Sequence, residues 1–258
     1  MRYRSPAAVA REMSDVHASY GVEFFSFVDD TFTTKKDWVQ DFCAEVGRLG
    51  LPGRVRWICL TRADMVDEAL LRLMRKAGCV RVEFGIESGS ETGRRFLRKG
   101  LTEQAVVDGF RAARRAGLST MGFAILNIPG ETPEDVEATF DLVRRADPDY
   151  LQVSFLTPYP GTWLRDEAER EGRVTTDDWS RYSFLNDVVL RNDGLTPAEL
   201  QAAYLRFVRR FWFRPRTAVK LARLVLNGTT RLRPLARTAW LGVAATIESR
   251  RRREGRRG

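Results

Sequence analysis

The segment Ala77 to Ser90 reads AGCVRVEFGIESGS and decides the fold class. Gly78 suits the end of a helix, because glycine readily adopts the left-handed conformation that closes many helices. Val80 to Ile86 is rich in β-branched and aromatic residues and predicts a strand. The polar turn Glu87 to Gly89 follows at once. The segment therefore predicts a helix-to-strand junction of an α/β protein, with polar side chains at the carboxyl end of the strand.

The same succession of elements recurs on both sides of this segment. We predict strands over residues 23–28, 55–60, 80–86, 120–126 and 150–155, and helices over residues 5–20, 35–49, 67–77, 102–116 and 133–145. Repeated βα units form a parallel sheet, which is either a barrel or an open doubly wound sheet. Both architectures place the ligand site at the carboxyl ends of the strands.

Composition narrows the class of protein. The 258 residues are 43% hydrophobic, as in a globular protein, and contain one histidine, which excludes His-based zinc sites and catalytic triads. No run of about 18 apolar residues and no secretory signal is present, so we expect a cytoplasmic protein. Lysine and arginine outnumber the acidic residues by 43 to 34, and the excess lies mainly beyond Arg206.

The three cysteines do not form a metal-binding pattern. Cys43 falls in a predicted helix, Cys59 in a strand and Cys79 near the amino end of another strand. We expect that they do not converge on one metal and that they are buried in the core, since free cysteine behaves as a small hydrophobic residue. Their odd number also argues against a disulfide framework.

Polar residues at the predicted strand ends are the candidate site. Asp29, Asp30 and Thr31 follow the first strand, where the carboxylates could bind a metal or an ammonium group, or Asp30 could simply cap the turn. Arg62 could hold a carboxylate through its planar guanidinium, or pair with Asp64 or Glu87. Glu87 and Ser88 could bind a ribose or an amino group, with a solvated turn residue and a helix cap as the alternatives.

Five motifs in order resemble the radical S-adenosylmethionine (SAM) superfamily, and most closely its branch that often carries an amino-terminal cobalamin-binding domain. The resemblance covers roughly residues 1–172. Its motifs are VDDTF (28–32), WICLTRAD (57–64), AGCVRVEFGIESGS (77–90), GFAILNIPGET (122–132) and TPYPGT (157–162). The loop in the fourth motif has one glycine and no lysine, which argues against a nucleotide-triphosphate cradle.

The resemblance implies a partial (β/α)6 barrel and the cofactors of the family. These are SAM, a [4Fe-4S] cluster and, in the intact protein, cobalamin; cleavage of SAM yields a 5′-deoxyadenosyl radical. The family holds its cluster in a Cys-x3-Cys-x2-Cys loop, which does not occur in this sequence. We therefore expect a barrel fragment whose first strand and cluster loop lie upstream, and which alone is inactive and aggregation-prone.

By the same resemblance, the predicted site residues acquire roles toward SAM. Asp29, Asp30 and Thr31 take the place of the strand end that binds the methionine amino group, and Glu87 and Ser88 approach the ribose and carboxylate. Asn127 and Pro129 flank the adenine, while Arg62 contacts the SAM carboxylate or the substrate.

The carboxyl-terminal part allows other interpretations. We expect the barrel over residues 1–172, a helical basic extension over 173–249 and a disordered basic tail over 250–258. The arginines and aromatic residues of the extension could contact anionic lipid, with nucleic acid less favoured, or the helix could pack on the barrel. The substrate would be a small or lipid-like molecule. A non-catalytic binding or scaffold module is the alternative to an enzyme.

Overall fold

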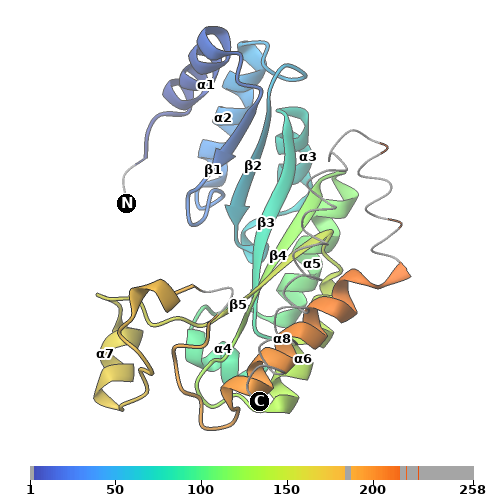
Figure 1. Cartoon of the computed structure of the whole chain (residues 1–258). Coiled ribbons are helices and arrows are strands. Elements are labelled where there is room, and N and C mark those ends of the chain that lie inside the picture. Colours follow the sequence, from blue (N-terminus) through green and yellow to red (C-terminus); the bar gives the residue numbers. More distant parts are fainter. Residues whose placement is uncertain (1–2, 184–186, 216–218, 220–225, 227–258) are drawn as a thin grey trace. The chain divides into compact units, whose positions relative to one another are not determined.

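The fold is built on one five-stranded sheet with the strand order β1-β2-β3-β4-β5 (Figure 1). The computed structural model describes residues 3–183, 187–215, 219 and 226. The strands are β1 (Phe24–Phe27), β2 (Arg56–Thr61), β3 (Cys79–Glu87), β4 (Ser119–Leu126) and β5 (Tyr150–Phe155). The pairs β1/β2, β2/β3 and β3/β4 are parallel. The order never reverses, unlike that of a doubly wound sheet, so the expected partial barrel is confirmed.

Helices precede and connect the strands and begin where the sequence predicts. Helix α1 (Pro6–Tyr20) precedes β1, and the connecting helices are α2 (Lys36–Arg48), α3 (Glu68–Lys76), α5 (Glu103–Arg115) and α6 (Pro133–Ala146). Side chains accept hydrogen bonds from the first turns, at 3.3 Å from Ala8 N to Ser5 and 2.7 Å from Leu70 N to Asp67. Such caps satisfy backbone donors that the helix leaves unpaired.

Four short elements were not predicted. They are α4 (Glu91–Leu97), α7 (Trp163–Arg170) and the single 3-10 turns η1 (Ala63–Met65) and η2 (Trp179–Arg181). Each is too short to show a helical period of hydrophobic residues. The last helix is α8 (Pro197–Trp212), which lies within the predicted helical extension, and most of the residues after Pro215 lie outside the described part of the chain.

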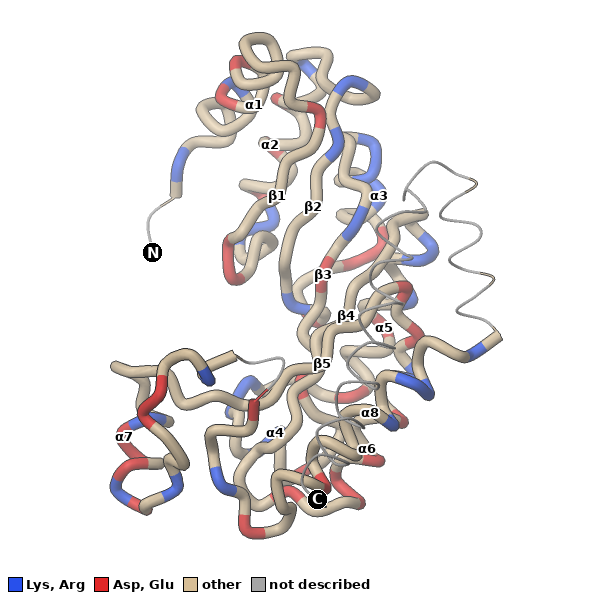
Figure 2. The backbone as a smooth tube through the Cα atoms, viewed as in Figure 1, with Lys and Arg blue, Asp and Glu red and all other residues tan. Residues whose placement is uncertain are grey.

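The side chains of strand β3 alternate between the two faces of the sheet. Val82, Phe84 and Ile86 are buried beneath the helices, and the Phe84 ring meets Phe110 of α5 with centroids 5.0 Å apart. Alternation places Arg81 and Glu83 on the opposite face, where they form an ion pair of 2.8 Å. Figure 2 shows these charged positions along β3, whereas β1 and most of β2 carry uncharged residues.

An aromatic cluster fixes α2 onto β1 and β2. The rings of Phe27, Phe42 and Trp57 pack edge to face, with centroids between 5.4 and 5.6 Å apart. Phe42 and Trp57 have no exposed surface, so each contributes about 1.5–3 kcal/mol to folding. The Trp57 indole also donates to the Ala77 carbonyl at 2.8 Å, which ties β2 to the end of α3.

The described residues group into two compact units, Met1–Ala124 with Asp141–Gln152, and Ile125–Phe140 with Val153–Gly258. In the second unit α8 packs through Phe207, whose ring lies 5.1 Å from that of Phe140. Phe207 and Phe211 are buried, which supports packing on the fold rather than lipid contact for this part of the extension. Among the described residues no helix is long and apolar enough to span a bilayer. The domain boundary near residue 172 and the basic tail stay predictions; the tail lies outside the described residues.

We predict that Gly109→Ala destabilises the protein. A Cβ atom at Gly109, in α5, would lie 2.6 Å from the Ala63 carbonyl oxygen and 2.8 Å from the Ala63 Cβ. Overpacking of this kind costs about 1–3 kcal/mol. The matched control is Gly47→Ala in α2, where no heavy atom lies within 4 Å. It should leave stability unchanged or raise it by up to about 1 kcal/mol. Urea unfolding measures both variants, and equal midpoints would contradict this view of the α5/η1 contact.

Candidate functional site

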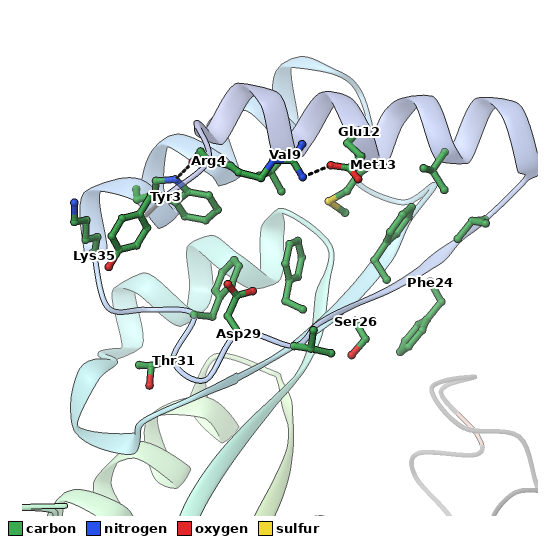
Figure 3. Close-up of a pocket in the computed structure, with 17 residues that line it drawn as sticks. Tyr3, Arg4, Val9, Glu12, Met13, Phe24, Ser26, Asp29, Thr31 and Lys35 are labelled. Atoms are coloured by element: carbon green, nitrogen blue, oxygen red, sulfur yellow. Dashed lines mark hydrogen bonds and ion pairs between the residues drawn. The ribbon is translucent and has the colours of Figure 1, made fainter. Parts of the chain in front are cut away.

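A cavity of about 800 Å³ runs along β1, between this strand, helix α1 and the turn after the strand (Figure 3). Val9 and Met13 of α1 contribute apolar walls, and Phe25 of β1 lies opposite. Tyr3, Arg4 and Lys35 gather at one end of the cavity and Phe24 lies at the other. The volume is in the range of a small-molecule or cofactor site.

The cavity exists because β1 lies at the edge of the sheet. Within the described residues β1 pairs with β2 alone, so its other edge presents backbone N–H and C=O groups without a strand partner. Side chains on this strand and directly after it are also open to solvent, with 49% of Phe24 and 86% of Val28 exposed. Such an edge is a template for pairing with another extended segment.

The turn after β1 places Asp29 against this cavity. The hydroxyl of Thr31 donates to the Asp30 carbonyl at 2.7 Å, and that of Thr34 donates to the Thr31 carbonyl at 2.6 Å. These threonines, rather than the Asp30 side chain, hold the turn, so the predicted capping role of Asp30 is not observed. In the described part of the chain neither Asp29 nor Asp30 has a hydrogen bond or ion pair at its carboxylate. Asp29 and Thr31 line the cavity and Asp30 does not.

Arg62, after β2, pairs with Asp64, as one of the two alternatives predicted. Its Nε lies 3.0 Å from Asp64 Oδ1 and its Nη2 lies 2.7 Å from Oδ2. The same Nη2 donates to the Lys99 carbonyl at 2.9 Å. The hydrogen bonds to Asp64 raise the pKa of Arg62, with a further contribution from the charge of Glu87. These bonds use Nε and Nη2, and leave the two N–H donors of Nη1 for a carboxylate ligand.

Glu87 occupies a constrained turn at the end of β3. Its φ is 64°, and the register of β3 against β4 shifts between Gly85 and Glu87. The carboxylate folds back over Gly85, where an added Cβ would lie 2.3 Å from Glu87 Oε1. Lys99 Nζ lies 2.5 Å from the same oxygen, and only 13% of the Glu87 side chain is exposed. Glu87 is thus a paired, nearly buried group rather than a solvated turn residue.

Ser88 is buried behind this turn and supports it. The Ser88 hydroxyl accepts from Ser90 N at 3.1 Å and lies 3.0 Å from the Ser90 hydroxyl. Ser90, and not Ser88, caps α4 by accepting from Gly93 N at 2.9 Å. The structure therefore gives Ser88 a positioning role in the loop that carries Glu87.

Asn127 and Pro129 belong to the second unit and lie in the loop after β4. Asn127 is buried with φ of 69°, and its Nδ2 donates to the Leu190 carbonyl at 2.9 Å. Among the described residues its Oδ1 is buried without a partner. Pro129 is half-buried. The loop is held by two residues that the sequence did not single out: Glu131 accepts from Ile128 N at 3.2 Å, and Asn192 donates to the Ile128 carbonyl at 3.0 Å.

The three cysteines are buried, as predicted for residues with structural roles in the core. Burial raises the pKa of Cys59, with a further contribution from Cys79. Burial, followed by the charge of Cys79, raises the pKa of Cys43 to about 12. None lines the cavity, and the described residues contain no cluster of three side chains suited to a metal ion. The residues present therefore do not fit an iron-sulfur cluster.

We predict that these thiols are unreactive in the folded protein. At about pH 8 a thiol reagent should label none of them until denaturant is added, because the thiolate is the reactive form. The pKa of the Cys43 thiol is higher in the folded protein than in the unfolded chain, so the thiol ionises first in the unfolded chain. Its contribution to stability is therefore lost as the pH rises above about 8.5. Rapid labelling of a native thiol by Ellman's reagent would contradict the observed burial.

The sequence of this chain is similar to those of known proteins. The sequence profile described as the radical SAM superfamily matches residues 1–143. An uncharacterized methyltransferase of Pyrococcus horikoshii is 33% identical over 85% of this chain and 47% of its own length. The anaerobic magnesium-protoporphyrin IX monomethyl ester cyclase of Cereibacter sphaeroides is 30% identical over 83% of this chain and 35% of its own length. The chain thus spans about half or less of these curated relatives.

A solved structure shows the same fold. The radical SAM methyltransferase TsrM of Kitasatospora setae, solved with cobalamin and a [4Fe-4S] cluster bound, superposes with a TM-score of 0.59 and 24% identity. The superposition covers 78% of this chain and 41% of that chain. This likeness shows the fold of the chain.

Proposed function

The chain belongs to the radical SAM superfamily, and we propose that it forms the SAM-binding part of an enzyme barrel whose cluster-binding segment is not among these 258 residues. The intact enzyme would cleave SAM reductively at a [4Fe-4S] cluster. The observation that carries the proposal is the cavity along the open edge of β1, closed at one end by the Asp29 turn. In this proposal the family cofactor binds in the cavity, and an additional strand pairs with the open edge of β1.

The charges at the strand ends suit the polar groups of SAM. Asp29 offers a cavity-lining carboxylate that no described side chain neutralises, which suits the methionine ammonium group. Glu87 is held by the turn through Ser88 and by Lys99, and its fixed carboxylate suits a ribose hydroxyl. In the second unit, taken by itself, the buried Oδ1 of Asn127 has no partner among the described residues and suits an N–H donor.

The thiolates for the cluster must come from elsewhere, since Cys43, Cys59 and Cys79 are buried away from the cavity. An extended segment pairing with β1 would bring a cysteine loop beside Asp29. Methyl transfer supported by cobalamin is the reaction class that we favour, because the Pyrococcus relative is described as a methyltransferase. Contact of the basic extension with a membrane surface is a further proposal that rests on residues beyond the described helix α8.

We predict that the 258-residue chain retains no stoichiometric cluster after anaerobic reconstitution with iron and sulfide. A chimera that adds the amino-terminal part of the Pyrococcus relative should bind iron and stay soluble, because the added strand covers β1. Iron content and gel filtration measure both. The control is the same chimera with alanine at the added cysteines. A soluble, cluster-loaded 258-residue chain would contradict the proposal.

We predict that Asp29→Asn in this chimera weakens SAM binding about 10-fold, since a hydrogen bond to a charged group is worth about 1.5–3 kcal/mol. Asp30→Asn is the matched control, because the Asp30 side chain does not line the cavity. Equilibrium dialysis with labelled SAM gives the affinities without turnover. Equal losses in the two variants would remove Asp29 from the site. If the 258-residue chain binds SAM but neither it nor the chimera cleaves SAM, the result would favour a non-catalytic binding module.

A further inference from the structure

A group of aromatic side chains follows the carboxyl end of β5 in the second unit. Tyr159 lies in the loop directly after the strand, and Trp179 and Tyr182 lie in and after the 3-10 turn η2. The Trp179 and Tyr182 ring centroids are 4.5 Å apart, and those of Tyr159 and Tyr182 are 6.4 Å apart. Trp179 is 55% exposed, so one large aromatic surface remains open to solvent.

The rings are held in place by hydrogen bonds rather than by burial. The Tyr182 hydroxyl donates to the Thr176 carbonyl at 2.8 Å and accepts from Arg165 of α7. The Tyr159 hydroxyl donates to the Tyr182 carbonyl at 3.3 Å. The Arg165 guanidinium carbon also lies 5.7 Å from the centroids of both the Trp179 and Tyr182 rings. A preorganised surface of this kind loses little conformational entropy when a ligand stacks on it.

Arg165 gives this surface no net positive charge. Its side chain is 10% exposed, and it pairs with Glu169 at 2.5 Å and Asp177 at 2.8 Å. Asp177 is 83% exposed, and Asp178 adds another carboxylate beside Trp179. Both signs alternate along α7 in Figure 2. Arg181, in the same turn, pairs with Asp187 at 3.8 Å, so carboxylates still outnumber cations around the rings. Such a surface repels anionic lipid and nucleic acid, whereas aromatic faces attract cationic rings.

We propose that Trp179, Tyr159 and Tyr182 form a stacking site for a planar aromatic group that is uncharged or cationic. The 4.5 Å between the Trp179 and Tyr182 centroids leaves no room for a ring between them, so the ligand stacks on the open face of Trp179. The loop follows a strand end, where barrels place their ligands. We assign the planar group to the substrate rather than to SAM, and only this assignment rests on the proposed function.

The test uses the full chain without SAM or a cluster, and N-methylquinolinium as the probe. Saturation-transfer NMR should detect its binding, and its fully saturated analogue, which carries the same charge, should bind at least about five-fold more weakly. Quinoline-2-carboxylate should also bind more weakly, because the surrounding carboxylates repel it.

Variants locate the probe. Trp179→Ala should weaken probe binding about five-fold or more, whereas Trp179→Phe, which keeps an aromatic face, should retain most of it. Phe213→Ala removes an exposed aromatic ring after α8 and should leave binding unchanged. Absence of probe binding, equal binding of the saturated analogue, or no effect of Trp179→Ala would each overturn the stacking site. Because no readout needs SAM, these outcomes are independent of whether the SAM proposal holds.

Discussion

Strand β1 pairs with β2 on one side, and within the described residues its other edge has no strand partner. Backbone groups on a sheet edge retain their hydrogen-bonding capacity, so this edge is a binding surface in its own right. The cavity, the exposure of Phe24 and Val28, and the placement of Asp29 all follow from it. The helix-covered face of β1 is by contrast fixed by the packing of Phe27 against Phe42 and Trp57.

The polar strand ends differ in how far they are already engaged. Glu87 is paired with Lys99, so a ligand that binds its carboxylate must compete with an ion pair. Arg62 is paired with Asp64 but keeps the N–H donors of Nη1 for a ligand. The Asp29 carboxylate has no such competitor among the described residues. The Lys99 side chain is 48% exposed and that of Glu87 is 13% exposed, so a charged ligand reaches this ion pair from the Lys99 side. The turn at Glu87, with its positive φ, fixes the orientation of the Glu87 carboxylate. Gly85 has no side chain and so leaves space for this carboxylate.

Local signals allowed much of this fold to be predicted from the sequence. The capped starts of α1, α3 and α5, and the runs of β-branched and aromatic residues in the strands, depend on neighbouring residues and appear at the expected positions. Contacts between distant residues could not be predicted in this way. The support of the Asn127 loop by Asn192, for example, joins residues far apart in the chain. Helices α4 and α7 are too short for a periodic signal.

The most direct test of the account is hydrogen exchange at the backbone amides of β1. Amides that point away from β2 should exchange rapidly in the 258-residue chain and become protected in a chimera that carries the amino-terminal part of the Pyrococcus relative. Amides that point toward β2 should be protected in both proteins and serve as the internal reference. Protection of both sets in the 258-residue chain would show that the edge is already paired, and would contradict its assignment as the place for a cluster-bearing strand.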